Sequence, residues 1–160
     1  MTVQPLGVAE EDVVATLLDR CRDDFRRWIN GDGTAYELPD DGTIYGPFGG
    51  SAVRGGPSTS AMQRDGARKW WLAGSGDVEL VTGGVSGDIA WLVYIERATV
   101  TFRGLDQPRR WELRITDLFR RNVDGWERFH IHEDACVDMR GLDAVLAQLP
   151  ETSFDERPGG

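Results

Sequence analysis

The hydrophobic spacing of this chain changes along its length, and that change constrains the fold more than any other sequence feature. Across residues 10–29 the apolar side chains recur at intervals of three and four, which predicts one long amphipathic helix. Acidic residues begin this segment and Arg26 and Arg27 lie near its end, and both placements suit the helix dipole. Gly31 and Gly33 predict that the helix stops there.

After this helix the sequence predicts mainly strands. Gly-Gly, Gly-Leu-Asp and Asp-Gly turns separate segments rich in the residues that strands favour, which indicates an antiparallel meander. The candidate strands are residues 77–82, 88–102, 109–122 and 125–137.

Shorter elements complete the expected order. Extended pieces at residues 43–45 and 51–54 flank a Gly-Pro turn and predict a hairpin, residues 58–71 predict a second helix, and residues 142–149 a short terminal one. Helices beside an antiparallel meander indicate an α+β domain, with the helices on one face of a curved sheet. A sheet curved around a helix leaves a hollow that suits a small molecule.

Composition narrows the classes of partner. The 160 residues suit one domain, and 27 acidic against 18 basic side chains give a net charge of −9, which argues against nucleic acid and anionic membranes. The longest apolar run, residues 89–95, is too short to span a bilayer, and the first residues lack a secretory signal pattern, so we expect a soluble cytoplasmic protein. Cys21 and Cys136 are expected to be free thiols.

Several segments in the second half of the chain resemble a known family. Residues 85–91, 95–97 and 113–121, the Asp124-Gly125-Trp126 turn and the box at 130–134 are similar to the SnoaL-like and ketosteroid isomerase-like branch of the NTF2-like superfamily. The resemblance implies a cone: a curved antiparallel sheet wrapped around a long N-terminal helix, with an internal cavity. It also implies a homodimer formed through the outer sheet face.

The resemblance and the predicted elements together suggest three parts of the chain. We expect a flexible N-terminus over residues 1–9, the NTF2-like domain over residues 10–140, and a short helix with a flexible tail over residues 141–160.

Alternation along the strands assigns side chains to faces. We expect the rows that contain Trp91 and Trp111 to point inward, because both rows are largely apolar. Asp117 lies in the Trp111 row and is therefore a carboxylate among apolar side chains. The residues expected on the outer face, as a dimer surface, are Tyr94, Glu96, Arg114, Thr116 and Arg120.

The resemblance assigns a catalytic role to Asp117. This residue matches the position at which ketosteroid isomerases hold a protonated acid that donates to the substrate oxygen, so it implies an oxyanion donor or general acid. Gly46 and Phe25 stand where that family has its base and its oxyanion tyrosine. We therefore do not expect ketosteroid isomerisation by that machinery.

His130 and His132 are the only histidines of the chain and lie two residues apart on a predicted strand. The resemblance implies that their face looks into the cavity, where they could exchange protons with a ligand beside Asp117. Two alternatives stay open: the pair could bind a metal ion with a carboxylate, or form a hydrogen-bonded wall without chemistry.

These observations lead to two hypotheses about function. The first is a cofactor-independent isomerase, cyclase or dehydratase that acts on a small apolar or polycyclic substrate, with Asp117, His132 and His130 as catalytic residues and no bound metal. The second is a non-catalytic ligand-binding or oligomerisation module. The residues expected to contact the ligand are Trp28, Phe25, Trp91, Trp111, Ile115, Phe48 and Tyr45.

Overall fold

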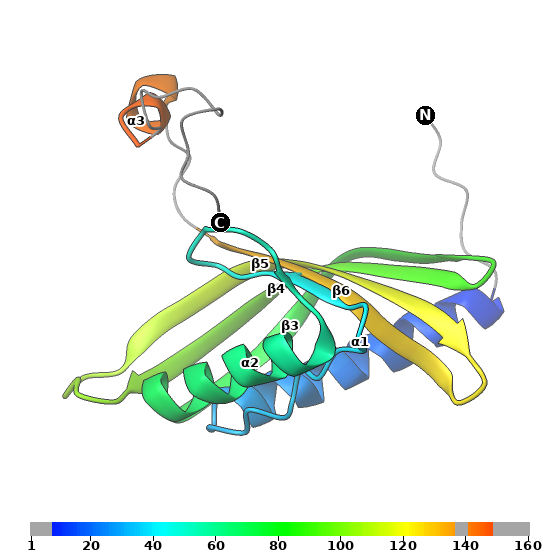
Figure 1. The fold of residues 1–160 in the computed structure, drawn as a ribbon, viewed down its shortest axis with the longest axis horizontal. Helices are drawn as coiled ribbons and strands as arrows, with labels where there is room; N and C mark the ends of the chain where they lie inside the picture. Colours follow the sequence, from blue (N-terminus) through cyan, green and yellow to red (C-terminus); the bar gives the residue numbers. More distant parts are fainter. Residues whose placement is uncertain (1–7, 137–140, 149–160) are drawn as a thin grey trace.

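A computed structural model describes residues 8–136 and 141–148 of the chain (Figure 1). The predictions for residues 1–7, 137–140 and 149–160 lie outside these described residues. The helices are α1 (Val8–Trp28), α2 (Gly56–Trp70) and α3 (Leu142–Leu146). The strands are β1 (Thr43–Tyr45), β2 (Val53–Arg54), β3 (Trp71–Ser86), β4 (Ile89–Phe102), β5 (Arg109–Asn122) and β6 (Gly125–Ala135).

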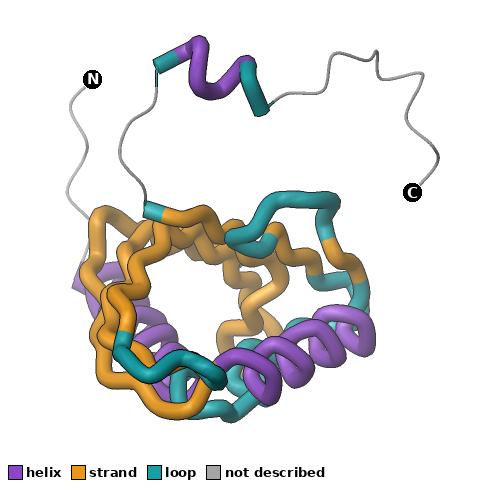
Figure 2. Tube along the Cα trace, turned by 90° about the vertical axis from the view of Figure 1, so that its left-hand side faces the viewer, coloured by secondary structure: helices purple, strands orange, loops and turns teal. Residues whose placement is uncertain are grey.

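The six strands form one curved sheet in the order β2-β1-β6-β5-β4-β3, and α1 packs across β3 and β4. Neighbouring strands are antiparallel except β1 and β6, which are parallel. Figure 2 shows the strands curving around the interior while α1 and α2 lie along the other side. The expected α+β cone is therefore confirmed. In the described part of the chain, no helix is long and apolar enough to cross a membrane.

The strand β3 is much longer than the predicted residues 77–82. It begins at Trp71, where the second helix was expected to end, and includes a glycine-rich stretch that resembles a turn in sequence. The glycines are needed for space: a Cβ at Gly74 would come within 3.0 Å of Ile29, and one at Gly76 within 2.9 Å of Phe25. Glycine in β3 therefore lets α1 lie close against the sheet.

The inward row of β4 is the opposite of the one expected. Ala90, Leu92, Tyr94 and Glu96 are buried, whereas Trp91, Val93 and Ile95 point outward and are half-buried. Both rows are apolar at most positions, so alternation could not distinguish them. The prediction was also wrong in placing Tyr94 and Glu96 on the outer face. The β5 prediction is confirmed, since Leu113, Ile115, Asp117 and Phe119 are all buried.

A β-bulge in β6 reverses the face of its side chains. The pairing with β5 shifts between Leu118 and Phe119, so that Phe129 is the extra residue between His130 and Arg128. Arg128 on one side of the bulge, and Ile131 and Glu133 on the other, are all buried. His130 and His132 therefore lie on the face opposite to these buried side chains, and the expectation that their face looks into the cavity was wrong.

Candidate functional site

Aromatic side chains from three elements meet at one end of the interior. Trp28 at the end of α1 lies 4.6 Å from Trp71 and 6.4 Å from Trp111, measured between ring centroids. Trp71 and Trp111 are themselves 5.0 Å apart in an edge-to-face arrangement. The indole Nε1 atoms of all three are buried without a hydrogen-bond partner. This aromatic cluster therefore carries three unused donors, which is unusual in a purely structural core.

A small pocket of about 50 Å³ lies beside this cluster and is called the inner pocket below. The end of α1, the β1–β2 loop, α2 and β6 all contribute to its wall. Its lining residues are Trp28, Gly46, Pro47, Phe48, Met62, Gln63, Trp70 and Glu133. Most of this surface is apolar or aromatic, with one amide and one carboxyl, which is typical of a ligand site.

Glu133 is the ionisable residue of the inner pocket. Its side chain is only 9% exposed and has no hydrogen-bond or ion-pair partner among the described residues. Burial raises the pKa of Glu133 well above its usual value, the carboxyls of Glu96 and Asp117 raise it further, and Arg128 lowers it. The protonated form of Glu133 is therefore favoured more than in a free carboxyl, which suits a group that donates a proton inside the pocket.

A larger open groove adjoins the inner pocket and is called the outer groove. It has a volume of about 600 Å³ and is lined by Pro47, Phe48, Arg110, Trp111, Glu112, Leu113, Ala135 and Cys136. Pro47 and Phe48 line both spaces, and Phe48 is 67% exposed on the β1–β2 loop. The aromatic ring of Phe48 therefore stands between the groove and the pocket.

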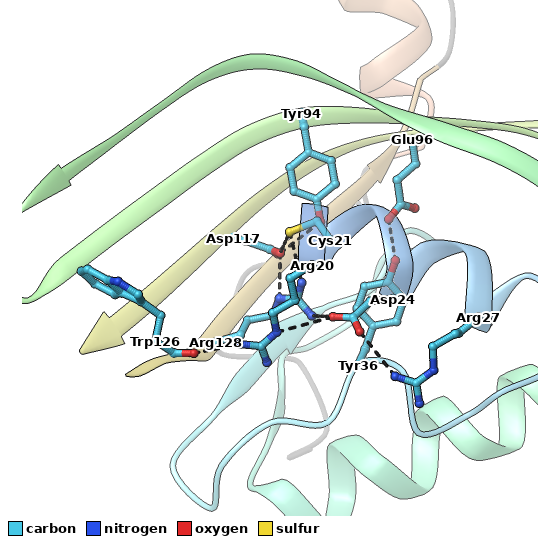
Figure 3. Close-up of polar contacts among 10 residues, drawn as sticks. All are labelled: Arg20, Cys21, Asp24, Arg27, Tyr36, Tyr94, Glu96, Asp117, Trp126 and Arg128. Atoms are coloured by element: carbon cyan, nitrogen blue, oxygen red, sulfur yellow. Dashed lines mark hydrogen bonds and ion pairs between the residues drawn. The ribbon is translucent and has the colours of Figure 1, made fainter. Parts of the chain in front are cut away.

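Deeper in the cone, Arg128 is the centre of a buried polar network (Figure 3). Its Nη1 donates to Oδ2 of Asp24 at 2.9 Å, and its Nε forms an ion pair with Oδ2 of Asp117 at 2.7 Å. The guanidinium lies between the rings of Tyr36 and Phe119, at 5.2 and 5.3 Å from their centroids. These contacts stabilise a buried cation from every side.

Two further groups complete the network around Asp117. The Tyr94 hydroxyl donates to Oδ2 of Asp117 at 3.0 Å, and Nη2 of Arg128 donates to the Cys21 sulfur at 3.2 Å. Burial raises the pKa of the Cys21 thiol to about 12, so this cysteine is not a nucleophile at neutral pH. The network holds these side chains in place, and neither Asp117 nor Cys21 lines the inner pocket or the outer groove.

Glu96 links the network to the aromatic cluster. The Tyr36 hydroxyl donates to its Oε1 at 2.7 Å (Figure 3). The Tyr36 ring also lies 6.0 Å from the ring of Trp28, measured between centroids. Burial raises the pKa of Glu96 to about 8, although the hydrogen bond from Tyr36 lowers it. Glu96 and Glu133 are thus two buried carboxyls that both favour the protonated form.

The predicted catalytic residues do not converge on one space. Asp117 is fully buried and pairs with Arg128, whereas His132 is exposed and His130 is half-buried. Their pairing explains this: His130 lies opposite Leu118 and His132 opposite Thr116, while Asp117 lies opposite Ile131. The expectation that both histidines face the cavity with Asp117 is wrong, because the bulge at Phe129 turns them outward.

The two histidines instead form part of the outer sheet surface. Nδ1 of His130 is 2.7 Å from the Thr43 hydroxyl, and the Tyr45 ring lies 5.5 Å from the ring of His132. Burial, together with the neighbouring His132, lowers the pKa of His130. In the described residues no group of three or more potential ligands could hold a metal ion.

The predicted ligand-contacting residues divide into three groups. Trp28 and Phe48 line the inner pocket, and Phe48 and Trp111 line the outer groove. Phe25 and Ile115 are buried in the core and line neither space. Trp91 and Tyr45 are on the outer face, so the expectation that they line the cavity is wrong.

Sequence reasoning missed Glu133, Gln63 and Trp70. One signal for Glu133 was available, because the apolar Ile131 between two histidines favours an inward Ile131 and therefore an inward Glu133. Gln63 and Trp70 lie on α2, whose weak amphipathic pattern does not show which side faces the sheet.

The sequence matches no family model, and no curated protein is significantly similar to it. Solved structures do match. A proposed dehydratase of the NTF2-like family from Streptomyces avermitilis has a TM-score of 0.66 at 16% identity, covering 80% of this chain and 99% of that one.

Two other solved structures are similar over comparable lengths. An NTF2-like superfamily protein from Salmonella enterica has a TM-score of 0.66 at 15% identity, over 82% of this chain and 96% of that one. The association domain of C. elegans CaMKII has a TM-score of 0.61 at 11% identity, over 81% and 100%. The chain therefore has the fold of the NTF2-like superfamily.

Proposed function

We propose that the chain is a cofactor-independent enzyme that binds a small ring-bearing molecule in the inner pocket and outer groove and moves a proton on it through Glu133. The observation that carries this proposal is the position of Glu133: a buried carboxyl without a partner that lines an aromatic pocket. Isomerases and dehydratases need a proton donor or acceptor shielded from water in this way.

The volume of the two spaces defines how a substrate would lie. The inner pocket, at about 50 Å³, has room for a small functional group, and the outer groove, at about 600 Å³, has room for the rest of the molecule. Displacement of Phe48, which borders both, would join them. The unused indole donors of Trp28, which lines the inner pocket, and of Trp111, which lines the outer groove, would orient an oxygen atom of the substrate.

The roles of Asp117, His130 and His132 change under this proposal. Asp117 on β5 pairs with Arg128 on β6 and is a positioning residue that holds the two strands together. Glu133 lies on β6 as well. The histidines on the outer face take no part in the proton transfer.

The experiment measures how fast the hydrogens next to the carbonyl group of cyclohexanone exchange with deuterium from heavy water. This rate reports proton transfer without knowledge of the natural substrate. The wild type should accelerate exchange, and Glu133→Gln should lose about 100-fold or more of that acceleration. Asp134→Asn is the matched control, because its carboxylate lies next along β6 and pairs with Arg114 on the outer surface. Equal exchange rates in Glu133→Gln and the wild type would exclude Glu133 as the proton-transfer group.

A non-catalytic oligomerisation module is the second candidate. The outward row of β4, with Trp91, Val93 and Ile95, is apolar and half-buried, and a second copy could cover it as a homodimer. The similarity to an association domain supports this candidate. Sedimentation equilibrium tests it: a species of 17.8 kDa excludes self-association, and a dimer without ligand binding or exchange activity favours the module over the enzyme.

A further inference from the structure

The inner pocket presents aromatic faces and a carboxyl, and no basic side chain lines it among the described residues. Trp28, Phe48 and Trp70 come from three separate segments and surround the space into which Glu133 points from β6. Phe48 packs edge-to-face on Trp70 with ring centroids 5.0 Å apart. Aromatic faces together with a carboxyl are the surroundings in which proteins bind organic ammonium groups.

The charged side chains buried in the cone also favour the binding of a cation in the inner pocket. Among the described residues the buried ionisable carboxyls are Asp24, Glu96, Asp117 and Glu133, and the one buried guanidinium is that of Arg128. Arg128 contacts Asp24 and Asp117, and Tyr36 donates to Glu96. Glu133 is the carboxyl left without a partner, and it is the one that lines the pocket.

We propose that the inner pocket is the subsite for the ammonium group of a ring-bearing amine whose ring lies in the outer groove. This inference rests on the proposed function, since it names the substrate class for the same site. A volume of about 50 Å³ corresponds to roughly one or two water molecules, which suits a primary ammonium group better than a bulky head group.

Binding of the ammonium group has a consequence for protons. Burial favours the protonated form of Glu133 in the empty pocket, whereas an ammonium ion beside it favours the carboxylate. One proton then leaves Glu133 for solvent, while the ligand keeps its own charge. The other charged groups that act on Glu133 are Glu96 from β4, Asp117 from β5 and Arg128 from β6, and Gln63 from α2 is the uncharged polar neighbour.

Titration calorimetry with two probes that differ only in their head group tests this inference. Phenethylammonium should bind the wild type at least about tenfold more tightly than phenethyl alcohol. Repeating the titration in buffers of different ionisation enthalpy counts the protons released, and a net release is expected for the ammonium probe and none for the alcohol.

Variants show whether Glu133 is the origin of both effects. Glu133→Gln should remove the preference for the ammonium probe and the proton release, while it still binds the alcohol. Asp134→Asn changes the neighbouring carboxylate on the outer surface and should retain both effects. Because selectivity and proton release are measured in the wild type as well, the test does not depend on the variant being stable.

The possible results distinguish a failure of the amine subsite from a failure of the proposed proton-transfer function. Binding of the alcohol at equal or greater affinity, without proton release for the ammonium probe, overturns the amine subsite and leaves a small-molecule site in place. Failure of both probes to bind overturns the subsite and contradicts the proposed function as well. A preference that survives Glu133→Gln also overturns the subsite.

Discussion

Nε of Arg128 lies 2.7 Å from Oδ2 of Asp117, and both side chains are completely inaccessible to solvent. The pair joins two neighbouring strands, β5 and β6, beneath α1. Oδ1 of Asp117 is buried without a hydrogen-bond partner, so the carboxylate relies on Arg128, Tyr94 and Cys21 through its other oxygen. A carboxylate in this position stabilises the fold, whereas a catalytic acid would face the ligand.

Loss of the Asp117 charge should therefore unfold the protein more easily. Asp117→Asn leaves the Arg128 guanidinium without its closest counter-ion, and breaking a buried pair from one side costs about 3–5 kcal/mol. Chemical denaturation measures the free energy of unfolding. Asp134→Asn, which breaks the exposed pair with Arg114, is the matched control and should cost less than about 1 kcal/mol. Equal losses in the two variants would show that Asp117 is not a structural counter-ion.

The stability of the protein should depend on pH through Glu96. Its pKa is raised from 4.5 to about 8 in the folded state, so the folded chain holds a proton that the unfolded chain releases. The stabilisation that protonated Glu96 contributes to the free energy of unfolding is complete below pH 4.5 and is lost as the pH rises towards about 8. Over this range the free energy of unfolding falls by at most about 1.4 kcal/mol per pH unit. The pKa of Glu133 is also raised, so this residue too makes the folded state less stable as the pH rises.

Glu96→Gln should flatten this dependence, because the amide keeps the shape of the acid and cannot ionise. Denaturation curves across the same pH range give the slope for the wild type and the variant. Glu112→Gln is a suitable control, since its arginine neighbours lower the pKa of Glu112 and give a dependence of opposite sign. An unchanged slope in Glu96→Gln would mean that Glu96 does not titrate inside the cone.

Replacing the histidines should not affect the pocket. His132 is exposed on the outer face and His130 contacts Thr43 and Tyr45 there, so neither reaches Glu133. Binding of phenethyl alcohol to His132→Ala and His130→Ala should stay within about twofold of the wild type by calorimetry. A tenfold or greater loss in either variant, with unchanged stability, would place the histidines in the site after all.

The general architecture was predictable because its signals are local. The spacing of apolar residues predicted α1, the Gly-Pro turn predicted the β1–β2 hairpin, and Asp-Gly turns predicted the limits of β5 and β6. The length of β3 was not predictable, because its glycines serve the approach of α1, which is a contact between distant segments.

The site was harder to predict than the fold because it depends on side-chain direction. A single extra residue at Phe129 decides whether His132 or Glu133 faces inward. The apolar Ile131 between the two histidines favours an inward Glu133, but no local pattern predicts the bulge itself. In β4 both faces are apolar, so alternation gave no reason to prefer Tyr94 over Trp91. Of the residues expected to contact a ligand, Trp28 and Phe48 line the inner pocket, and Phe48 and Trp111 line the outer groove.

We place the ligand site in the inner pocket beside Glu133. The indole N–H signals in a two-dimensional NMR spectrum, assigned by single Trp→Phe variants, test it most directly during titration with phenethyl alcohol. We expect shifts for Trp28 and Trp70, which line the pocket, and for Trp111, which lines the groove, and unchanged signals for Trp91 on the outer face. Shifts confined to Trp91, with the other three unmoved, would contradict it.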